Sequence, residues 1–162
     1  MLSYASQGSC KRLGLLMPLY PATLQHLPDL ADDDALVVGT QVLSALSYMH
    51  DAGLGHCDVK APNIFLDADG SAHLGDYGST RRLGEDADEK TASHVPVDAN
   101  ENGLDVDKAS AALDRLLLAV TLLERLKLIQ LHPQRLCMQM VHEGIQGAKT
   151  EVLRSFLQSL LP

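Results

Sequence analysis

The chain has 162 residues, of which 46% are hydrophobic and 4% aromatic, and it carries a formal net charge of −8. This length and composition favour one globular domain with an aliphatic core and argue against wholesale disorder. The acidic balance argues against binding to nucleic acid, whose phosphates select basic surfaces. The three cysteines form no C-x-x-C pair, so neither a zinc site nor a disulfide scaffold is indicated, and an intracellular, cytoplasmic protein is expected.

The first predicted element is a short buried strand over residues 13–20, which Pro18 and Pro21 bring to an end. A helix is predicted over residues 32–52. Three consecutive aspartates suit its start, where carboxylates meet exposed N–H groups, and apolar residues then follow at helical spacing. Gly53 is a suitable residue to end this helix.

A tight β-hairpin is predicted next, with strands at residues 64–66 and 72–74 and a turn at Asp69-Gly70. The polar and acidic segment from residue 84 to residue 103 is expected to be a mobile loop.

A long helix is predicted over residues 104–131, apolar on nearly all sides between Leu116 and Leu123. A helix of this kind is usually buried in the middle of a domain. Charged residues interrupt its apolar stretch, so it is not expected to span a membrane.

The tail from residue 133 to residue 162 predicts two short amphipathic helices, which Gly144 and Gly147 separate. The predicted fold class is therefore mainly α, within the α+β family, with a small β-hairpin around a buried central helix. Residues 1–162 are expected to form a single domain.

The sharpest motif is His56-Cys-Asp58-Val-Lys60-Ala-Pro-Asn63, which resembles the protein-kinase catalytic loop H-R-D-L-x-x-x-N. Its histidine, aspartate and asparagine stand at the family spacing, and its lysine stands where serine/threonine kinases place one. Four fixed residues at about 5% usage each would match by chance in roughly one chain in a thousand of this length. Residues 56–66 are interpreted as the catalytic loop.

Three further segments strengthen the resemblance to eukaryotic-type protein kinases. Asp76-Tyr-Gly78 resembles the D-F-G motif and opens an activation segment over residues 76–98. The segment from Asp114 to Glu124 is similar to the central buried helix of the family, D-x-W-S-x-G-V-x-L-x-E. Residues 13–20 look like the hinge. The whole chain is therefore interpreted as the C-terminal lobe of such a kinase.

The resemblance implies transfer of the ATP γ-phosphoryl group to a serine or threonine hydroxyl of a protein, with Mg²⁺. Asp58 would accept the proton of the substrate hydroxyl, and Lys60 would place positive charge beside the phosphate. Asn63 and Asp76 would offer hard oxygen ligands to the metal. Asp114 would brace the catalytic loop by accepting hydrogen bonds from its backbone N–H groups.

The resemblance also implies a set of nucleotide contacts. Met17, Leu19 and Tyr20 of the hinge would offer backbone groups to adenine, and Leu66 would contact the nucleotide from the strand after the catalytic loop. Asn63 and Asp76 complete the predicted cofactor-binding set, while His56 is expected to brace the loop rather than take part in the chemistry.

The sequence departs from the family pattern in several places. No Gly-rich phosphate loop and no V-A-I-K-like lysine precede the hinge, so most of the N-terminal lobe is expected to be missing. Cys57 replaces the arginine of H-R-D, so phosphorylation at Thr80, Thr91 or Ser93 would not be sensed in the usual way. The segment Val95-Pro-Val-Asp98 would be a degenerate counterpart of A-P-E.

Other interpretations remain open beside an active kinase. The chain can be a pseudokinase that binds a partner without turnover, a fragment of a longer active kinase, or a kinase-like phosphotransferase acting on small molecules. The sequence names neither the protein substrate nor the binding partner.

Overall fold

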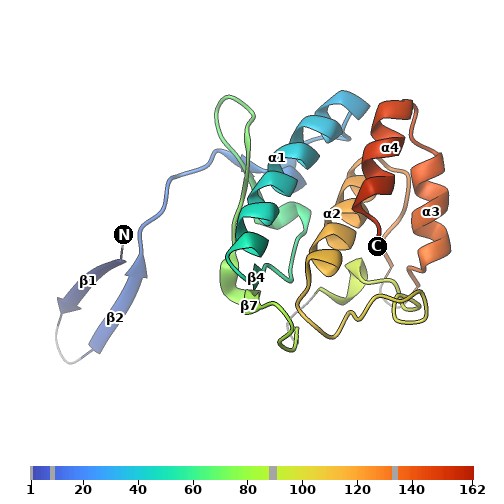
Figure 1. Cartoon of the computed structure of the whole chain (residues 1–162). Helices are drawn as coiled ribbons and strands as arrows, with labels where there is room; N and C mark the ends of the chain where they lie inside the picture. Colours follow the sequence, from blue (N-terminus) through green and yellow to red (C-terminus); the bar gives the residue numbers. More distant parts are fainter. Residues whose placement is uncertain (1, 8–9, 88–90, 133–134) are drawn as a thin grey trace.

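The structure is a computed structural model that describes residues 2–7, 10–87, 91–132 and 135–162. Side chains are described from residue 16 onward. Four helices and small antiparallel sheets make up this part of the chain, so the fold is mainly α with a small β component (Figure 1). The helices are α1 (Asp32–Asp51), α2 (Ala111–Arg125), α3 (Met138–Gln146) and α4 (Glu151–Leu160). The strands are β1 (Leu2–Gln7), β2 (Cys10–Leu15), β3 (Ala22–Thr23), β4 (Leu54–Gly55), β5 (Ile64–Leu66), β6 (Ala72–Leu74) and β7 (Arg81–Arg82).

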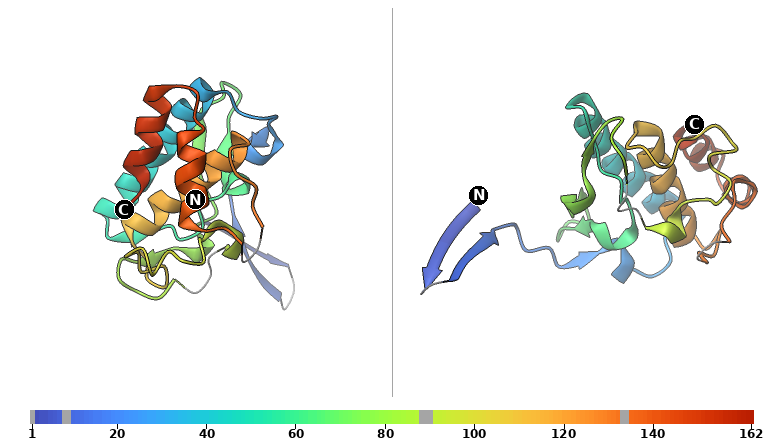
Figure 2. Two further views of the ribbon diagram at one scale, coloured as in Figure 1. Left: turned by 90° about the vertical axis from the view of Figure 1, so that its right-hand side faces the viewer. Right: turned by 90° about the horizontal axis from the view of Figure 1, so that it is seen from below.

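Helix α2 forms the centre of the molecule. It lies between α1 on one side and α3 and α4 on the other (Figures 1 and 2). Every residue from Leu116 to Leu123 is buried, which confirms the prediction of a helix that is apolar all round and sits in the core.

The predicted length of this central helix, residues 104–131, is wrong at both ends. The helix begins after Ser110, whose side chain accepts a hydrogen bond from the Leu113 N–H. Residues before Ser110 instead pair in extended form with the segment after β7, through the hydrogen bonds between Gly84 and Ala109 and between Ala109 and Glu85. Backbone groups that pair with another segment cannot also form helical hydrogen bonds.

Helix α2 ends at Arg125 with Leu126 as its C-terminal cap, because the next residue, Lys127, has a φ of 58°. This left-handed backbone conformation is unfavourable for most residues and terminates the helix. Arg125 is buried at this end and donates hydrogen bonds to the carbonyl oxygens of Leu27 (2.6 Å) and Pro28 (3.1 Å), which fixes the segment before α1.

Helix α1 confirms the prediction of a helix over residues 32–52 to within one residue, and Gly53 follows with a φ of 76°. The three aspartates lie in the first turn rather than at the cap, which is Ala31. Asp32 accepts hydrogen bonds from the N–H groups of Lys149 (3.1 Å) and Thr150 (3.0 Å) and so ties the start of α1 to the start of α4.

The predicted hairpin is present as β5 and β6, and β3 pairs with the other side of β5. The Asp67 carboxylate accepts hydrogen bonds from the N–H groups of Asp69 (3.0 Å) and Ser71 (2.9 Å), and Gly70 has a φ of 81°. These interactions fix the turn and therefore the register in which Phe65 lies opposite His73.

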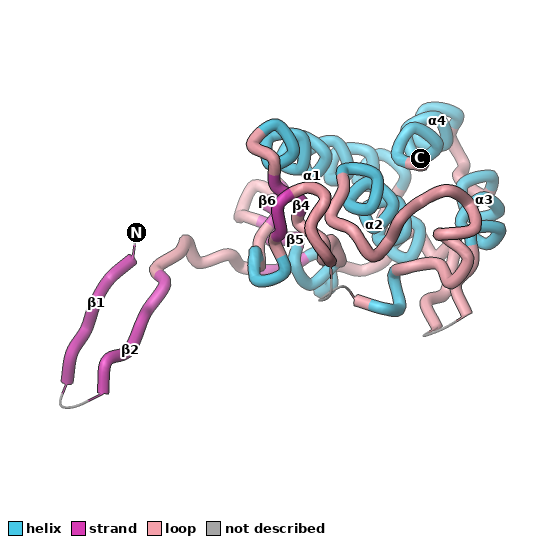
Figure 3. The backbone as a smooth tube through the Cα atoms, turned by 60° about the horizontal axis from the view of Figure 1, so that its bottom comes forward, coloured by secondary structure: helices cyan, strands magenta, loops and turns pink. Residues whose placement is uncertain are grey.

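The prediction of a buried strand over residues 13–20 is wrong. Strand β2 ends at Leu15 and pairs only with β1, as a hairpin that lies apart from the helical body (Figures 1 and 3). The residues that follow are in neither strand nor helix, and the side chains of Leu16 and Leu19 are 67% and 97% exposed. Pro18 has no N–H to donate to a ladder, which explains why the extended segment finds no partner strand.

The two short helices predicted for the tail are present as α3 and α4, with Thr150 capping α4 through a hydrogen bond from the Leu153 N–H. Of the two glycines expected to separate them, Gly147 lies between the helices, whereas Gly144 lies inside α3. A Cβ at Gly144 would lie 2.8 Å from a methyl carbon of Ile129, so close packing against the segment after α2 accounts for this glycine. Among the described residues, no helix combines the length and the apolar character that a bilayer crossing requires.

Gly39 of α1 provides a test of this packing. A Cβ there would lie 2.6 Å from the Phe156 ring and 2.9 Å from Leu122. Replacing glycine by alanine in a helix normally stabilises it by about 1 kcal/mol, but overpacking costs about 1–3 kcal/mol. We expect Gly39→Ala to lower the free energy of unfolding in urea titrations, whereas Thr40→Ala, at an exposed position of the same helix, leaves it within about 0.5 kcal/mol. A more stable Gly39→Ala variant would contradict the close contact.

Candidate active site

A buried carboxylate on α2 holds the predicted catalytic loop. Asp114 is fully buried, and its two oxygens accept hydrogen bonds from the N–H groups of His56 (2.8 Å) and Cys57 (2.7 Å). The ring of His50 on α1 lies 2.8 Å from the same carboxylate. The structure therefore confirms that Asp114 accepts backbone hydrogen bonds from this loop. Cys57 has a φ of 66°, and the two hydrogen bonds support this unusual conformation.

The ring of His56 connects the catalytic loop to the Asp76-Tyr-Gly78 segment. Its Nε2 lies 3.0 Å from the Gly75 carbonyl oxygen, and its Nδ1 lies 3.3 Å from the Asp58 nitrogen. Since a carbonyl only accepts and a backbone N–H only donates, Nε2 serves as the donor to Gly75 and Nδ1 as the acceptor from Asp58. His56 thus braces two chain segments and has no nitrogen free for chemistry.

Asp58 lies at the centre of a network of hydrogen bonds. One carboxylate oxygen accepts from the Thr91 hydroxyl at 2.5 Å, and the other lies 2.7 Å from Lys60 Nζ and 3.1 Å from Asn63 Nδ2. The Asn63 amide also donates to the Asp58 carbonyl at 2.9 Å. The short helical turn that contains Asn63 follows Lys60 directly, so three of the predicted residues are brought together within one loop.

Two effects on Asp58 oppose each other. Burial of the side chain, which is 8% exposed as a residue, raises its pKa. The hydrogen bonds from Lys60, Thr91 and Asn63, together with the charge of Lys60, outweigh burial and bring the pKa below its ordinary value of 3.8. Asp58 is therefore a carboxylate at neutral pH, ready to accept a hydrogen bond.

Thr91 is the site residue whose part in this network the sequence did not reveal. It was a candidate for phosphorylation, together with Thr80 and Ser93. In the structure its hydroxyl accepts a hydrogen bond from Lys60 Nζ at 2.8 Å and donates one to Asp58. A hydroxyl residue in the activation segment is the only signal, and residues 76–98 contain four serines and threonines: Ser79, Thr80, Thr91 and Ser93.

A cleft of about 800 Å³ contains both predicted metal ligands, Asn63 and Asp76. A hydrogen bond from the Gly75 N–H to the Asn63 carbonyl (2.9 Å) holds the two segments together. Asp76 is exposed and has a φ of 59°, and its carboxylate accepts one long hydrogen bond from the Gly78 N–H at 3.4 Å. This backbone conformation presents the carboxylate at the cleft.

Not all of the residues predicted to form the hinge contacts line the cleft. Met17, Pro18 and Tyr20 line the cleft, whereas the side chain of Leu19 does not line it and is 97% exposed. Within the described part of the chain, Met17 to Tyr20 make no backbone hydrogen bond, so their backbone groups are available to a ligand.

The structure places Leu66, which was predicted to contact the nucleotide, outside the lining of this cleft. Leu66 is 3% exposed and lines a separate groove beside α1, while its neighbour Phe65 lines the cleft. Successive side chains of a strand point to opposite faces, so a shift of one residue moves a contact to the other side of the sheet.

The donor set fits a magnesium ion. Because the Asn63 amide nitrogen binds Asp58, its oxygen is the atom that can face a metal, and the Asp76 carboxylate supplies a second hard oxygen at the same cleft. No cluster of three or more His, Cys, Asp or Glu residues occurs in the described ranges. Two protein oxygens suit Mg²⁺, which usually keeps waters and phosphate oxygens as its other ligands.

His94 lies buried beside this network. It is 8% exposed, its Nε2 has no hydrogen-bond partner among the described residues, and its Nδ1 lies 3.2 Å from the Ser93 hydroxyl. Burial lowers the pKa of His94 to about 4, the charge of Asp58 partly offsets this, and that of Lys60 adds to it. His94 is therefore neutral at physiological pH.

A second groove, of about 470 Å³, adjoins the cleft. Its lining includes Lys60, Thr91, His94 and Glu124, and Pro62 lines both cavities. The Lys60–Thr91 pair is thus reached from the groove, while Asn63 and Asp76 are reached from the cleft.

The end of the predicted activation segment is anchored to α3. The Asp98 carboxylate accepts a hydrogen bond from the Met138 N–H at 2.8 Å, and the Val97 N–H donates to the Leu136 carbonyl at 2.9 Å. These contacts agree with a structural role for Val95–Asp98. That this segment corresponds to the A-P-E motif stays a prediction.

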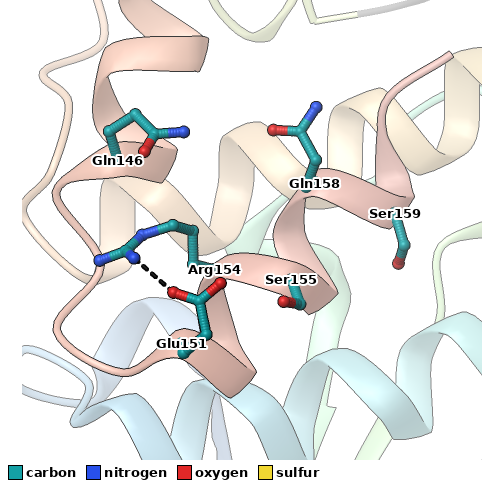
Figure 4. Close-up of a pocket in the computed structure, with 6 residues that line it drawn as sticks. All are labelled: Gln146, Glu151, Arg154, Ser155, Gln158 and Ser159. Atoms are coloured by element: carbon teal, nitrogen blue, oxygen red, sulfur yellow. Dashed lines mark hydrogen bonds and ion pairs between the residues drawn. The ribbon is translucent and has the colours of Figure 1, made fainter.

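Another pocket lies between α3 and α4, away from the network (Figure 4). Its lining is polar, and Arg154 forms an ion pair with Glu151 at 2.5 Å across it. None of the predicted site residues lines this pocket: it is formed by Gln146, Glu151, Arg154, Ser155, Gln158 and Ser159.

Comparison with known proteins agrees with the resemblance that the sequence motifs indicate. A family model described as protein kinase domain matches residues 9–100, more than half of the chain. A Wee1-like protein kinase of Arabidopsis thaliana is 30% identical over 132 residues, which are 76% of this chain and 25% of that protein.

Two further relatives carry serine/threonine in their names. The serine/threonine-protein kinase VRK1 of Caenorhabditis elegans is 33% identical over 93 residues, 52% of this chain and 15% of that protein. The serine/threonine-protein kinase PKH2 of Candida albicans is 33% identical over 98 residues, 60% of this chain and 9% of that protein. The chain therefore spans a quarter or less of the length of these relatives.

Removal of the Asp114 carboxylate tests its structural role. Asp114→Ala leaves two buried N–H groups without an acceptor, and each such loss costs about 1–3 kcal/mol. We expect the free energy of unfolding to fall by about 3 kcal/mol or more, as measured by urea denaturation. Asp51→Ala, at the exposed end of α1, is the control and should change it by less than about 0.5 kcal/mol. Equal stability of the two variants would show that Asp114 does not hold the loop.

The buried imidazole of His94 predicts a pH dependence of stability. Its pKa is about 4 in the folded chain against an ordinary 6.5, so the unfolded chain binds a proton that the folded chain does not between these values. The contribution is complete above pH 6.5 and is lost as the pH falls to 4, by about 3 kcal/mol.

The measurement is the free energy of unfolding at pH 7 and pH 4. His94→Gln should lose about 3 kcal/mol less than the parent chain over this interval, whereas the exposed His132→Gln should behave like the parent. Identical pH profiles for His94→Gln and the parent would refute the assignment. Asp58 is ionised over the whole interval because its pKa lies below 3.8, so its own contribution is lost only at lower pH.

Proposed function

The chain belongs to the protein kinase family, and we propose that it transfers the γ-phosphoryl group of ATP to a serine or threonine hydroxyl of a protein substrate. The observation that supports this most strongly is the network in which Lys60, Thr91 and Asn63 surround the ionised Asp58, beside a cleft that Asn63 shares with Asp76. Phosphoryl transfer depends mainly on positioning and on electrostatic stabilisation, and this arrangement supplies both.

Asp58 is proposed to orient the acceptor hydroxyl. Its carboxylate accepts a hydrogen bond from the substrate O–H, whose oxygen then forms a bond to the γ-phosphorus while the bond from that phosphorus to the ADP oxygen breaks. The hydroxyl proton passes to Asp58. Since the pKa of Asp58 lies below 3.8, the carboxylate is a weak base, and orientation of the hydroxyl is its main contribution.

Lys60 is proposed to stabilise the charge of the transferring group. Its ammonium has three N–H donors, and two of them meet Asp58 and Thr91. The third can bind a phosphate oxygen. The two existing interactions hold the side chain in place, so little entropy is lost when phosphate binds.

The metal cofactor is proposed to be Mg²⁺, held by the Asn63 amide oxygen and the Asp76 carboxylate. When bound, Mg²⁺ would neutralise the charge of the phosphates. The backbone groups of Met17 and Tyr20, which have no backbone partners among the described residues, are proposed to bind the adenine at the other end of the cleft.

The protein substrate is proposed to approach through the groove lined by Lys60, Thr91 and Glu124. This groove reaches the Asp58 network from a side that the nucleotide cleft does not occupy. Nucleotide and acceptor would then meet at Lys60, where Pro62 separates the two cavities.

A second function, binding of a nucleotide or partner without turnover, is favoured by the exposed edge of the cleft. Met17 and Tyr77 line it and are 51% and 57% exposed. An open, hydrated cleft weakens electrostatic contacts to phosphate. This alternative corresponds to a pseudokinase scaffold, and the same experiment separates it from catalysis.

Asp58→Asn keeps the size of the side chain but removes the charge that orients the acceptor. We expect phosphate transfer from radiolabelled ATP to a protein substrate to fall by about 10²–10⁴-fold, with the circular dichroism spectrum unchanged. Asp69→Asn, in the exposed hairpin turn, is the matched control and should retain full activity.

Activity that survives in Asp58→Asn would eliminate the proposed role of this residue. A parent chain that binds Mg·ATP in calorimetry but transfers no phosphate would support the scaffold function instead.

A further inference from the structure

An apolar groove of about 470 Å³ lies beside α1 and is separate from the cleft that contains Asn63 and Asp76. Its volume falls within the usual range of ligand pockets, about 300–1,000 Å³. Most of its lining is aliphatic and comes from three parts of the chain: Leu27 and Leu30 before α1, Val37 and Val38 of α1, and Leu66 of β5. We call it the α1 groove.

Hydrogen bonds hold the walls of the α1 groove in place. Strands β5 and β6 lie beside α1 (Figure 3), and the Ala72 N–H donates to Gln41 Oε1 at 2.8 Å, which ties the hairpin to the helix. Ala22 pairs with Leu66 between β3 and β5. Arg125 binds the backbone of the segment before α1. The groove is therefore preformed, and a ligand that enters it loses little free energy in ordering the walls.

The α1 groove carries negative charge and no cation to balance it. Asp34 lines it from the first turn of α1 and Asp67 from the hairpin turn. The hydrogen bond with His73 lowers the pKa of Asp67, so its carboxylate is ionised at neutral pH. Asp34 forms no ion pair with any residue that the structure describes. No lysine, arginine or histidine lines the groove in the described part of the chain.

The sequence around the groove extends this charge. Residues 22–38 contain four aspartates and residues 66–70 contain two, and neither range contains a lysine or an arginine. Such a surface repels the phosphates of nucleic acids and of anionic lipids, whereas it attracts lysine and arginine side chains. Charge complementarity therefore selects a cationic protein segment as the ligand.

The aliphatic lining adds a second requirement. Val37 is 54% exposed, so an apolar side chain at the edge of the groove is left in contact with water. Covering it with aliphatic side chains of a ligand is favourable. In an extended peptide, alternate side chains point to one face, so aliphatic residues at alternate positions can enter the groove together.

We propose that the α1 groove binds a segment of a partner protein that carries arginine or lysine residues beside aliphatic residues at alternate positions. None of the residues proposed for phosphoryl transfer lines this groove, so the interaction does not depend on catalysis. The partner is held beside the cleft and leaves the cleft free for the nucleotide.

The experiment measures binding of the whole 162-residue chain to a fluorescein-labelled decapeptide by fluorescence anisotropy. One half of the peptide is arginine, and the other half is leucine alternating with serine. At about 0.15 M salt the Debye length is about 8 Å, so charges close to the groove dominate. We expect a peptide with glutamate in place of every arginine to bind at least about tenfold more weakly, and one with serine in place of every leucine at least about threefold more weakly.

Two matched pairs of variants locate the binding site. Asp34→Lys reverses a charge that lines the groove, whereas Asp33→Lys makes the same change at the adjacent exposed residue, which does not line it. Val37→Ser removes an apolar contact, and Val152→Ser is its control on α4, where Val152 is 65% exposed.

We expect Asp34→Lys and Val37→Ser to weaken binding of the arginine–leucine decapeptide at least about threefold, and the two controls to weaken it less than about twofold. All four positions are exposed, so each variant should keep the circular dichroism spectrum of the parent.

Equal affinity for the arginine and glutamate peptides, or no binding at about 1 mM peptide, would overturn the proposal. An equal loss in Asp34→Lys and Asp33→Lys would place the peptide elsewhere on the acidic surface and would overturn it too. A parent chain that dimerises in ultracentrifugation, with the dimer lost in Val37→Ser, would assign the groove to a second copy of the chain instead. Peptide binding requires no phosphate transfer, so failure of the proposed function leaves these outcomes unchanged.

Discussion

The hydrogen bonds between the Asp114 carboxylate and the backbone of residues 56 and 57 are the interaction on which the rest of the site depends. A carboxylate with no exposure to water is unfavourable unless its oxygens are satisfied, and here two backbone N–H groups and the His50 ring satisfy them. The catalytic loop thus follows the position of α2, the most buried helix of the molecule. Thr121, about two turns further along α2, donates a hydrogen bond to the Val59 carbonyl at 3.2 Å.

A series of hydrogen bonds connects the catalytic loop, which α2 holds, to the cleft. His56 binds the Gly75 carbonyl, Gly75 binds the Asn63 carbonyl, and Asn63 binds Asp58, so the loop and the segment before Asp76 form one connected unit. Each contact uses a backbone group on at least one side or a side chain within the same loop. Such a unit holds its polar atoms in place before any ligand binds, and preorganisation of this kind is what phosphoryl transfer requires.

Asp58 and His94 lie close together and are both buried, but burial decides the charge state of only one of them. Burial raises the pKa of Asp58, but hydrogen bonds and the adjacent ammonium of Lys60 outweigh it. His94 is buried nearby, its Nε2 meets no partner in the part of the chain that the structure describes, and burial dominates, so it stays neutral at physiological pH. The difference arises because hydrogen-bond donors converge on the Asp58 carboxylate and stabilise its charged form, whereas no acceptor among the described residues meets His94 Nε2 to stabilise a charged imidazole.

The sequence by itself determined the elements whose signals are local. The α1 helix, the β5–β6 hairpin with its Asp69-Gly70 turn and the buried character of Leu116–Leu123 follow from spacing and turn chemistry, and the motif around Asp58 indicated the family. Only the tertiary structure decided the features that depend on partners distant in the chain. It showed that pairing of residues 84–85 with residue 109 shortens the central helix, that Phe65 and not Leu66 faces the cleft, and that Thr91 joins Asp58 and Lys60. A hydrogen bond between residues more than 20 positions apart, or the face on which a strand residue lies, is fixed by how segments pack together, and no local pattern in the sequence records it.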